Sequence, residues 1–452
     1  MTTPPLPTIE VYSTLTRTKR PLVTVKPGHV GMYLCGPTVY KPSHIGHMVG
    51  PVIFDTVKRH LAYSGWKVTW VVNVTDVDDK IIVESAARGT TMAALAAEMT
   101  ADYLENLAAL GVTGIDEMPK ATEHIGTIIA FIEGLVAKGC AYASDGDVYF
   151  DVTKDADYGK LTNRSVEQMQ GEGGSTAERK RSAADFALWK KAKPGEPAWD
   201  SPWGPGRPGW HIECSAMSKA ILGPHFDIHG GGLDLVFPHH ENEAAQTRMA
   251  RGSELARIWM HNGMLQLAGE KMAKSTGNIE PLAAVVERWG PEAVILFFVS
   301  GHYRQPLLFG DTELEAARTS ARRIREQAAR TVAGPSPEEL SGHREAFFDS
   351  LADDFNTPKA LAALHAWLRG ASGIDSPGNE DLVAMLTCLG LESLLEPAEG
   401  PEADESALAL LREREEARAA GDFERADALR DELAALGWEV RDGAGGAELV
   451  RP

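Results

Sequence analysis

Cysteine is scarce in this chain of 452 residues, which holds only four: Cys35, Cys140, Cys214 and Cys388. No two of them form a CxxC pair, and four distant cysteines cannot make a disulfide framework for a chain of this length. We therefore expect reduced thiols that are free for metal binding or chemistry. No apolar stretch approaches the roughly 18 residues that a membrane span requires. The N-terminus also lacks the basic and apolar segments of a secretory signal, so we expect a cytoplasmic protein with no membrane partner.

Positive charge is also in short supply, because 45 Lys and Arg residues face 64 Asp and Glu residues and give a net charge of −19. Such a balance argues at first against a polyanionic partner. Nucleic acids, however, are bound by local basic surface rather than by overall charge. Basic residues cluster at 179–181, 190–193 and 318–325. The charge therefore permits an RNA partner without pointing to one.

The first 80 residues follow a strand–helix–strand pattern. A β-favouring stretch at residues 32–35 ends at a Gly-Pro turn signal, and residues 68–74 (VTWVVNV) have the composition of a parallel strand covered on both faces. Between them, helical spacing places apolar residues on one face, ending before Gly65; these are Val49, Val52, Ile53, Val57 and Leu61. A β–α–β unit of this kind predicts an α/β fold with a doubly wound, Rossmann-like parallel sheet.

The rest of the chain predicts further parts, as its length does. Residues 86–138 are helical in pattern, 139–209 are less regular and rich in Gly and Pro, and the β/α pattern returns over 210–309. After residue 312 the chain is helical, with a linker near 396–405 before a charged helical hairpin and a short tail. We expect an α/β domain in two halves (1–120 and 210–312), a connective insertion (121–209), a helical bundle (313–398) and a C-terminal hairpin with a tail (399–452).

Two short motifs suggest a site for phosphate. His44-Ile45-Gly46-His47 stands at the mouth of the first helix, where free amides and the helix dipole favour anions. Two imidazoles there can donate to a phosphate, and Gly46 leaves room for a nucleotide. Lys271 and Lys274, followed by Ser275, lie in a loop where they could hold a triphosphate as point charges. Taken alone, the first motif is short enough to arise by chance, and the second has the composition of a solvated basic turn.

Together, the HIGH motif and the later KMAKS segment (residues 271–275) resemble the two signatures of class I aminoacyl-tRNA synthetases. Ala273 departs from the usual Ser, and we expect this to affect loop mobility rather than catalysis, because the lysines carry the charge. The resemblance implies catalytic roles for four residues, His44, His47, Lys271 and Lys274. It implies ATP binding by those four together with Gly46 and Ser275.

A third group of residues has the chemistry of a metal site. Cys35 follows the first strand, Cys214 lies in the segment WHIEC, and Glu243 closes the segment HHENE. On a helix, both His239 and His240 would lie one turn from Glu243, so spacing does not choose between them. Thiolate, imidazole and carboxylate ligands together suit zinc.

Longer strings resemble the cysteinyl-tRNA synthetase family, in the order that the family has them. They are CGPTVY (35–40), NVTDVDDK (73–80), GWHIECSAM (209–217), FDIHGGG (226–232), PHHENE (238–243) and, near the C-terminus, DFERADALRD (422–431). The resemblance implies zinc ligands at Cys35, Cys214, His239 and Glu243, one ion per chain. It implies contacts with cysteine or its adenylate at Thr38, Thr75, Trp210, His229 and Asp234.

The same resemblance implies that the two-part α/β domain is catalytic and that the α-helical region over 313–398 binds the anticodon. It also implies an activity and its partners. The expected enzyme activates L-cysteine with ATP and Mg²⁺, then transfers it to tRNA(Cys) as a monomer. Two alternatives stay open from the sequence. One is a ligase of the same fold that joins cysteine to an amino sugar and needs no anticodon reader. The other is a non-catalytic, zinc-dependent RNA-binding relative, against which the intact histidine and lysine pairs argue.

Overall fold

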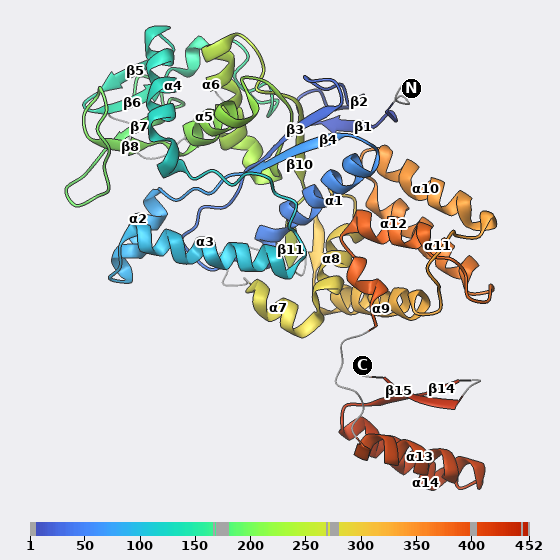
Figure 1. Ribbon diagram of the computed structural model, residues 1–452. Helices are drawn as coiled ribbons and strands as arrows, with labels where there is room; N and C mark the ends of the chain where they lie inside the picture. The colour runs from blue at the N-terminus through green and yellow to red at the C-terminus, as the bar shows by residue number, and fades with distance from the viewer. Residues whose placement is uncertain are drawn as a thin grey trace. The chain divides into compact units, whose positions relative to one another are not determined.

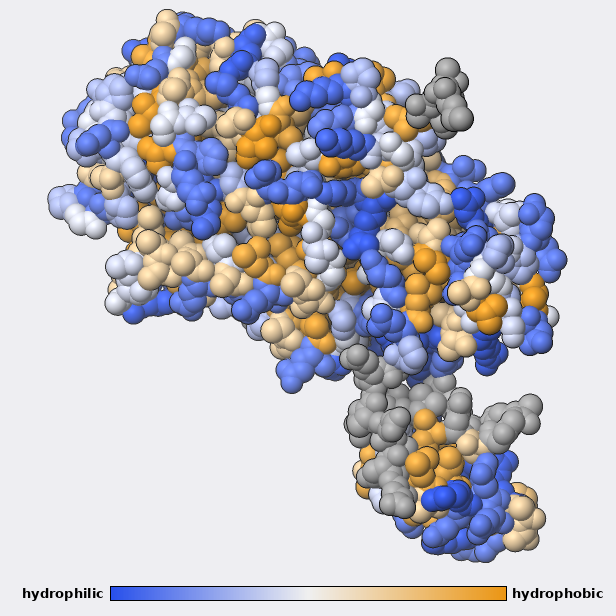
Figure 2. Space-filling view, viewed as in Figure 1, coloured by the Kyte–Doolittle hydropathy of each residue, from blue (hydrophilic) through white to orange (hydrophobic). Residues whose placement is uncertain are grey.

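The computed structural model describes residues 6–165, 168, 180–267, 270–271, 280–397, 405–443 and 446–450. The chain divides into two compact units, Met1–Leu395 and Glu396–Pro452. No helix in the stretches just named is long and apolar enough to cross a bilayer. Hydrophilic residues cover most of the face in Figure 2, with apolar residues in small groups between them.

A four-stranded parallel sheet lies at the centre of the first unit, in the strand order β10-β9-β3-β4 (Figure 1). Its strands are β3 (His29–Leu34), β4 (Lys67–Val72), β9 (Phe226–Gly232) and β10 (Ala256–Asn262). Helix α1 (Val49–Tyr63) connects β3 to β4, and α6 (Glu241–Arg251) lies between β9 and β10. The chain therefore moves outward in opposite directions from the neighbouring strands β3 and β9, which makes a topological switch point. The predicted doubly wound α/β fold is confirmed.

The apolar stripe of α1 explains how this helix covers the sheet. All five apolar residues of the predicted stripe are buried. The helix ends just before Gly65, whose φ of +90° suits a residue without a side chain at the end of a helix. The last three residues of β4 are completely buried, whereas Lys67 at its start is exposed.

The edges of the sheet are covered by irregular or short segments. The helical stretch expected over 86–138 is therefore interrupted: α2 (Asp79–Ala87) and α3 (Met92–Ala109) precede an extended segment, and α4 (Ile125–Ala137) follows it. In that segment the carbonyl of Glu117 accepts a hydrogen bond of 3.0 Å from Val72, the last residue of β4, and the carbonyl of Pro119 accepts one of 2.9 Å from Val74 just after the strand. The outward backbone groups of β4 need partners, and this requirement outweighs local helical propensity. At the other edge, a hairpin of β1 (Glu10–Ser13) and β2 (Thr18–Pro21) lies beside β10.

The insertion is more regular than its sequence suggests. It contains a four-stranded antiparallel sheet in the order β5-β6-β7-β8. The strands are β5 (Ala141–Ser144), β6 (Asp147–Phe150), β7 (Phe186–Lys191) and β8 (Gly206–Pro208). Their buried side chains form one cluster with residues of α4, α6 and α5 (Trp210–Leu222). The Pro-rich stretch over residues 194–205 is part of the connection between β7 and β8.

The helices after the catalytic sheet share its hydrophobic core. A small sheet of β11 (Leu265–Leu267), β12 (Glu270–Lys271) and β13 (Leu307–Phe309) accompanies α7 (Leu282–Trp289) and α8 (Pro291–Ser300). The helical region expected after residue 312 consists of α9 (Asp311–Ala328), α10 (Ser341–Ala352), α11 (Thr357–Ala371) and α12 (Glu380–Leu389). One cluster of buried residues runs from the central sheet through α1 and α8 into these four helices.

The second unit holds the expected helical hairpin, α13 (Glu405–Ala419) and α14 (Phe423–Ala435). The tail after it is a β-hairpin of β14 (Glu439–Gly443) and β15 (Gly446–Val450). A separate small core joins the helices to the β-hairpin, including Leu411, Leu433 and Trp438.

Candidate active site and metal centre

A cavity of about 380 Å³ opens at the carboxyl ends of β3, β9 and β10, beside the switch point of the sheet. Ligands of doubly wound sheets bind at this place. The HIGH motif and the turns after the three strands supply the walls. Its lining includes Leu34, Cys35, His44, Gly46, His47, Gly232, Asp234 and Asn262.

His44 and His47 lie together at this cavity, around the short helix η1 (Ile45–Met48) that leads into α1. Their rings stack with centroids 3.6 Å apart. The backbone amide of His44 donates to Nδ1 of His47 at 3.2 Å, so a neutral His47 carries its proton on Nε2. A Cβ added at Gly46 would lie 3.1 Å from the His44 ring. Glycine therefore keeps the motif compact.

The HIGH motif is bonded to the far end of the lysine loop. The amide of Ile45 donates to the carbonyl of Glu280 at 3.2 Å, and the amide of Leu282 donates to the carbonyl of Ser43 at 3.3 Å. The loop begins at β12, whose last residue is Lys271. Only the backbone of Lys271 is described, and Lys274 and Ser275 lie outside the described residues. The residues that follow the loop thus lie next to the first histidine motif. Because the two segments are far apart in the sequence, this contact could not be predicted.

The four residues implied as metal ligands lie together, with one candidate ligand atom of each within 4.8 Å of the others. The two sulfur atoms of Cys35 and Cys214 are 3.8 Å apart, and Sγ of Cys35 is 3.6 Å from Oε1 of Glu243. Nε2 of His239 is 2.9 Å from the same oxygen. Each of these four residues except Cys35 is buried.

Separate elements position these side chains. Cys35 follows β3 directly, and its amide donates to the carbonyl of Gly230 at 3.0 Å. Cys214 lies on α5, and Glu243 lies in the first turn of α6. His239 lies in η7 (Val236–His240), which continues into α6, so that His239 and Glu243 are one helical turn apart. The cluster therefore joins the first half of the sheet to the second.

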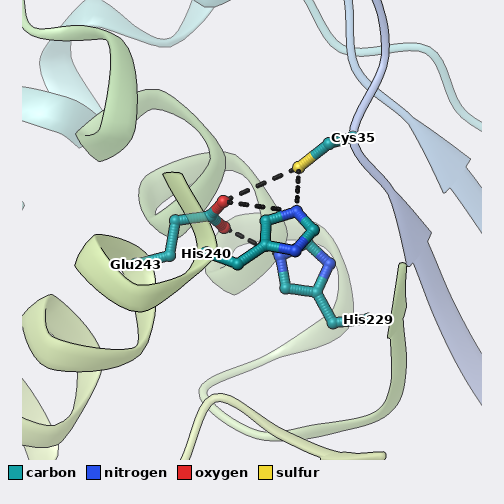
Figure 3. Close-up of side chains that lie close together, drawn as sticks. All are labelled: Cys35, His229, His240 and Glu243. Atoms are coloured by element: carbon teal, nitrogen blue, oxygen red, sulfur yellow. Dashed lines mark hydrogen bonds and ion pairs between the residues drawn. The ribbon is translucent and has the colours of Figure 1, made fainter. Parts of the chain in front are cut away.

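A second group shares Cys35 and Glu243 but adds His229 and His240 instead (Figure 3). His229 bonds at both ring nitrogens, from Nδ1 to the carbonyl of Tyr33 at 3.1 Å and from Nε2 to Oε2 of Glu243 at 2.8 Å. Because a carbonyl can only accept, Nδ1 of His229 is a donor. Nε2 of His240 lies 3.3 Å from the Cys35 sulfur. This group is therefore a second possible set of metal ligands. If the ion were held by the first group, these two histidines would be positioned as outer partners of Cys35 and Glu243.

The ionisation of the cluster follows from its burial and its close charges. Burial, together with the hydrogen bond to Cys214, raises the pKa of Cys35 well above its usual range. Burial also opposes ionisation of Cys214, but the Cys35 thiol and His239 lower the pKa of Cys214 to about 6. Burial likewise disfavours a charged His239, yet Glu243 and Cys214 raise its pKa to about 10. The protein alone therefore holds a thiolate beside an imidazolium, with the Glu243 carboxylate between charged neighbours.

Two thiols, an imidazole and a carboxylate form a donor set that fits zinc. A dication would favour the thiolate of Cys35 and the neutral ring of His239, because metal ligands bind in their deprotonated forms. Nδ1 of His239, the nitrogen away from Glu243, lies 3.0 Å from Nδ1 of His211. Trp210 stacks on the His239 ring, with centroids 4.3 Å apart. The ring of His239 is thus fixed on both sides.

The residues expected to contact cysteine lie at different depths. Asp234 lines the cavity. Trp210 and His229 instead contact the proposed ligands His239 and Glu243, and His229 is completely buried. Thr38 and Thr75 pair with each other through a backbone bridge, and the Thr75 hydroxyl donates to Glu213 at 3.1 Å. Only Asp234 among these five is a wall of the cavity in the part of the chain that the structure describes.

Several residues near the site escaped the sequence analysis. Nδ1 of His240 lies 2.7 Å from Nε2 of His261, whose Nδ1 lies 2.7 Å from the hydroxyl of Thr14. Asp102 on α3 accepts a hydrogen bond of 2.6 Å from the amide of Ser43. These contacts join segments far apart in the chain, and no local pattern marks them. His211 stands inside the segment WHIEC, which was the one available signal for it.

Comparison with known proteins agrees with this geometry. A family model described as the class I (C) tRNA synthetase catalytic domain matches residues 21–319, and one described as the cysteinyl-tRNA ligase anticodon binding domain matches residues 400–449. A cysteine–tRNA ligase from Thioalkalivibrio sulfidiphilus is 45% identical, over 98% of this chain and 100% of the relative. The chain belongs to the cysteine–tRNA ligase family. Another cysteine–tRNA ligase, from Alkalilimnicola ehrlichii, is 46% identical with the same coverage.

Solved structures show how far the fold extends beyond the cysteine–tRNA ligase family. Mycobacterium tuberculosis methionyl-tRNA synthetase, in complex with methionyl-adenylate, superposes with a TM-score of 0.59 at 17% identity, covering 81% of this chain and 89% of that one. A leucyl-tRNA synthetase from Agrobacterium radiobacter gives a TM-score of 0.56 at 11% identity, covering 82% and 83%. The match over 400–449 supports a cysteine–tRNA ligase over the amino-sugar ligase, which needs no anticodon reader.

Proposed function

We propose that this chain activates L-cysteine with ATP, used as its Mg²⁺ complex, and transfers it to the 3′-terminal adenosine of tRNA(Cys). The observation that carries the proposal is that Cys35 belongs to two sites at once. Its side chain belongs to the cluster of possible metal ligands and also lines the cavity that His44 and His47 line. Selection of the substrate sulfur and chemistry at phosphate would therefore take place side by side.

The four residues Cys35, Cys214, His239 and Glu243 would hold one zinc ion. When bound, zinc supplies a soft Lewis acid that accepts a thiolate far more readily than a hydroxyl. Cysteine and serine differ by one atom, and an apolar pocket discriminates such a difference by only about 1–3 kcal/mol. Selection by sulfur at the first binding step makes a separate editing domain unnecessary. His211, His229 and His240 would orient the ligands from behind.

In the first reaction the carboxylate of cysteine attacks the α-phosphorus of ATP, and the bond to the bridging oxygen of the β-phosphate breaks to release pyrophosphate. His44 and His47 would donate hydrogen bonds to the phosphate oxygens as negative charge develops there, with Lys271 and Lys274 on the other side. This is positioning and electrostatic stabilisation rather than covalent catalysis. Gly46 would leave room for the nucleotide, and Ser275 would add a hydroxyl contact.

The amino acid would be fixed by its polar groups as well as by its sulfur. The Asp234 carboxylate at the cavity wall is suited to bind the ammonium group of cysteine. Trp210 and His229 would keep the sulfur end of the pocket in shape through His239 and Glu243. The paired Thr38 and Thr75 would hold the turn after β3.

In the second reaction a ribose hydroxyl of the terminal adenosine attacks the carbonyl carbon of the adenylate and displaces AMP.

The tRNA would extend from the cavity along the helices. We assign contact with the anticodon arm to residues 313–398 and 399–452 together, because the anticodon-binding family model matches 400–449. We propose that the enzyme acts as a monomer in the cytoplasm. No part of the proposed reaction requires a residue from a second copy of the chain.

A charging assay tests the proposal. Purified protein is incubated with tRNA(Cys), ATP and either cysteine, serine or no amino acid, before and after removal of metal with a chelator, and zinc content is measured in parallel. We expect one zinc per chain, charging with cysteine alone, and loss of charging after metal removal. Cys214→Ala should lose the metal, whereas Cys140→Ala, which removes a buried thiol elsewhere, should keep it. Charging that ignores metal removal, or that accepts serine equally, would contradict the proposal.

A further inference from the structure

Another hollow of the first unit lies between α9 and α11. These two helices of the region after the catalytic sheet can be followed in Figure 1. Its volume is about 440 Å³. We propose that this groove binds a backbone phosphate of the tRNA, and so serves as a docking point outside the catalytic cavity. The inference rests on the proposed function, because it assumes tRNA as the partner. The groove is lined by Ala316, Thr319, Ser320, Arg323, Ala362, His365 and Arg369.

Helical spacing places these residues on two facing surfaces. Positions 316, 319, 320 and 323 share one face of α9, and positions 362, 365 and 369 share one face of α11. Ala316 and Ala362 are small and leave the floor open. The hydroxyl of Ser320 lies 3.1 Å from Nε2 of His365, which joins the two helices across the groove.

Two arginines at this groove have no acidic partner. Burial lowers the pKa of His365, and the charges of Arg369 and Arg323 lower it further, so both guanidinium groups act on this one ring. In the stretches that the structure describes, neither arginine forms an ion pair. The other arginines of α9 do so, in the pairs Arg318–Glu315, Arg322–Glu326 and Arg325–Glu292. Helix α11 contains no Asp or Glu at all.

An anion is the ligand that this arrangement fits. Two unpaired guanidinium groups repel each other, and a phosphate placed between them would remove that repulsion and accept bidentate hydrogen bonds. Hydroxyls of Thr319 and Ser320 stand on the same walls. The chain as a whole carries a net charge of −19, so a groove in which both charged side chains are arginines is a local exception. RNA backbones are bound by such local basic surface.

The experiment measures binding of a tRNA(Cys) transcript over a range of salt concentrations. Arg323→Ala and Arg369→Ala should each weaken binding, and the double variant should reduce the slope of log K against log[salt] by about 1, as the loss of one phosphate contact does. Arg318→Ala is the matched control, because it removes the same charge from the same helix but outside the groove. Its slope should not change. Ethylation of tRNA phosphates should interfere with binding of the wild type at one position where it no longer interferes with binding of the double variant.

Cysteine-dependent ATP–pyrophosphate exchange without tRNA separates this inference from the proposed function. The groove variants should keep wild-type exchange and show a raised KM for tRNA with an unchanged kcat. Loss of exchange in the wild type would refute the proposed function rather than the groove. If Arg318→Ala weakened binding as much as the groove variants, or if the double variant bound tRNA with the wild-type slope, the groove would be no phosphate site. Retained tRNA binding with loss of a protein partner would also overturn it.

Discussion

The amide of Ile45 donates a hydrogen bond of 3.2 Å to the carbonyl of Glu280, which joins the first histidine motif to the end of the lysine loop. The neighbouring amide of Ser43 is held from a third direction by the Asp102 carboxylate at 2.6 Å. The two motifs that surround ATP in the proposed mechanism are therefore fixed to each other through backbone groups. A change at Asp102 should disturb both of them without touching a substrate.

We expect Asp102→Ala to lower kcat of cysteine-dependent ATP–pyrophosphate exchange by about 10–100-fold, because small misplacements of catalytic groups have effects of this size. Zinc content should stay at the wild-type level, since Asp102 contacts none of the four proposed ligands. Glu98→Ala is the control, because it removes an exposed carboxylate from the same helix. Equal activity of Asp102→Ala and wild type would show that the Ser43 contact does not position the motif.

Gly36→Ala should release the metal and destabilise the fold. A Cβ at this position would lie 1.8 Å from the backbone oxygen of Asn73, so the turn that carries Cys35 must shift. We expect a lower zinc content and a loss of about 2 kcal/mol or more in the free energy of unfolding. Gly134→Ala is the matched control, since nothing lies within 4 Å of its added Cβ inside helix α4. It should stabilise the protein by about 0.5–1 kcal/mol, which urea denaturation can measure.

His211→Phe should weaken metal binding by about 10–100-fold, as the loss of an outer hydrogen-bond partner does at other metal sites. Phenylalanine keeps the ring that packs against Phe186 but loses the contact with Nδ1 of His239. Competition with a chromogenic chelator measures the affinity, and His343→Phe on α10 serves as the control. Unchanged affinity with a correctly folded variant would remove His211 from the metal centre.

Stability should fall at mildly acidic pH because of His60. Burial lowers the pKa of this residue to about 4, and in the described chain neither ring nitrogen has a hydrogen-bond partner. Between the unfolded pKa near 6.5 and the folded pKa, only the unfolded chain takes up a proton, so stability is lost as pH falls through this window.

The matched variant is His60→Phe, which cannot take up that proton. From pH 7 to pH 5 the wild type should lose about 2 kcal/mol more than this variant. Denaturation in urea at the two pH values measures the difference. Parallel losses in both proteins would show that His60 does not titrate in this way.

Local patterns predicted the parts of the fold that local forces decide. The stripe of α1 and the buried run of β4 were readable because burial on one or both faces leaves a period in the sequence. Residues 110–120 were misjudged as helical because their conformation depends on hydrogen bonds to β4, which the sequence does not display. The sheet of the insertion was missed for a similar reason, since its strands are short and separated by long connections.

In the candidate site, too, local patterns predicted some residues, whereas contacts between distant segments could not be predicted. Spacing alone could suggest His239 or His240 with Glu243, and the family resemblance chose His239. The structure places both histidines at the cluster and gives His240 a contact with Cys35. The contact of Thr14 with His261 and that of Asp102 with Ser43 join distant segments, so no periodicity could reveal them. The structure shows which of the expected site residues lie together, but their roles remain predictions, and Lys274 and Ser275 lie outside the described residues.

The covered edges of the central sheet affect how readily the protein aggregates. The end of β4 is bonded to Glu117, Val74 just after it is bonded to Pro119, and Trp259 of β10 is bonded to residues 13 and 14. These edges therefore offer few free backbone groups to a strand from another molecule. Open edges of this kind nucleate cross-β aggregates. The extended segment beside β4 and the β1–β2 hairpin beside β10 thus protect the sheet from self-association. A truncation that removes the hairpin should make the enzyme prone to precipitate while its cavity is still intact.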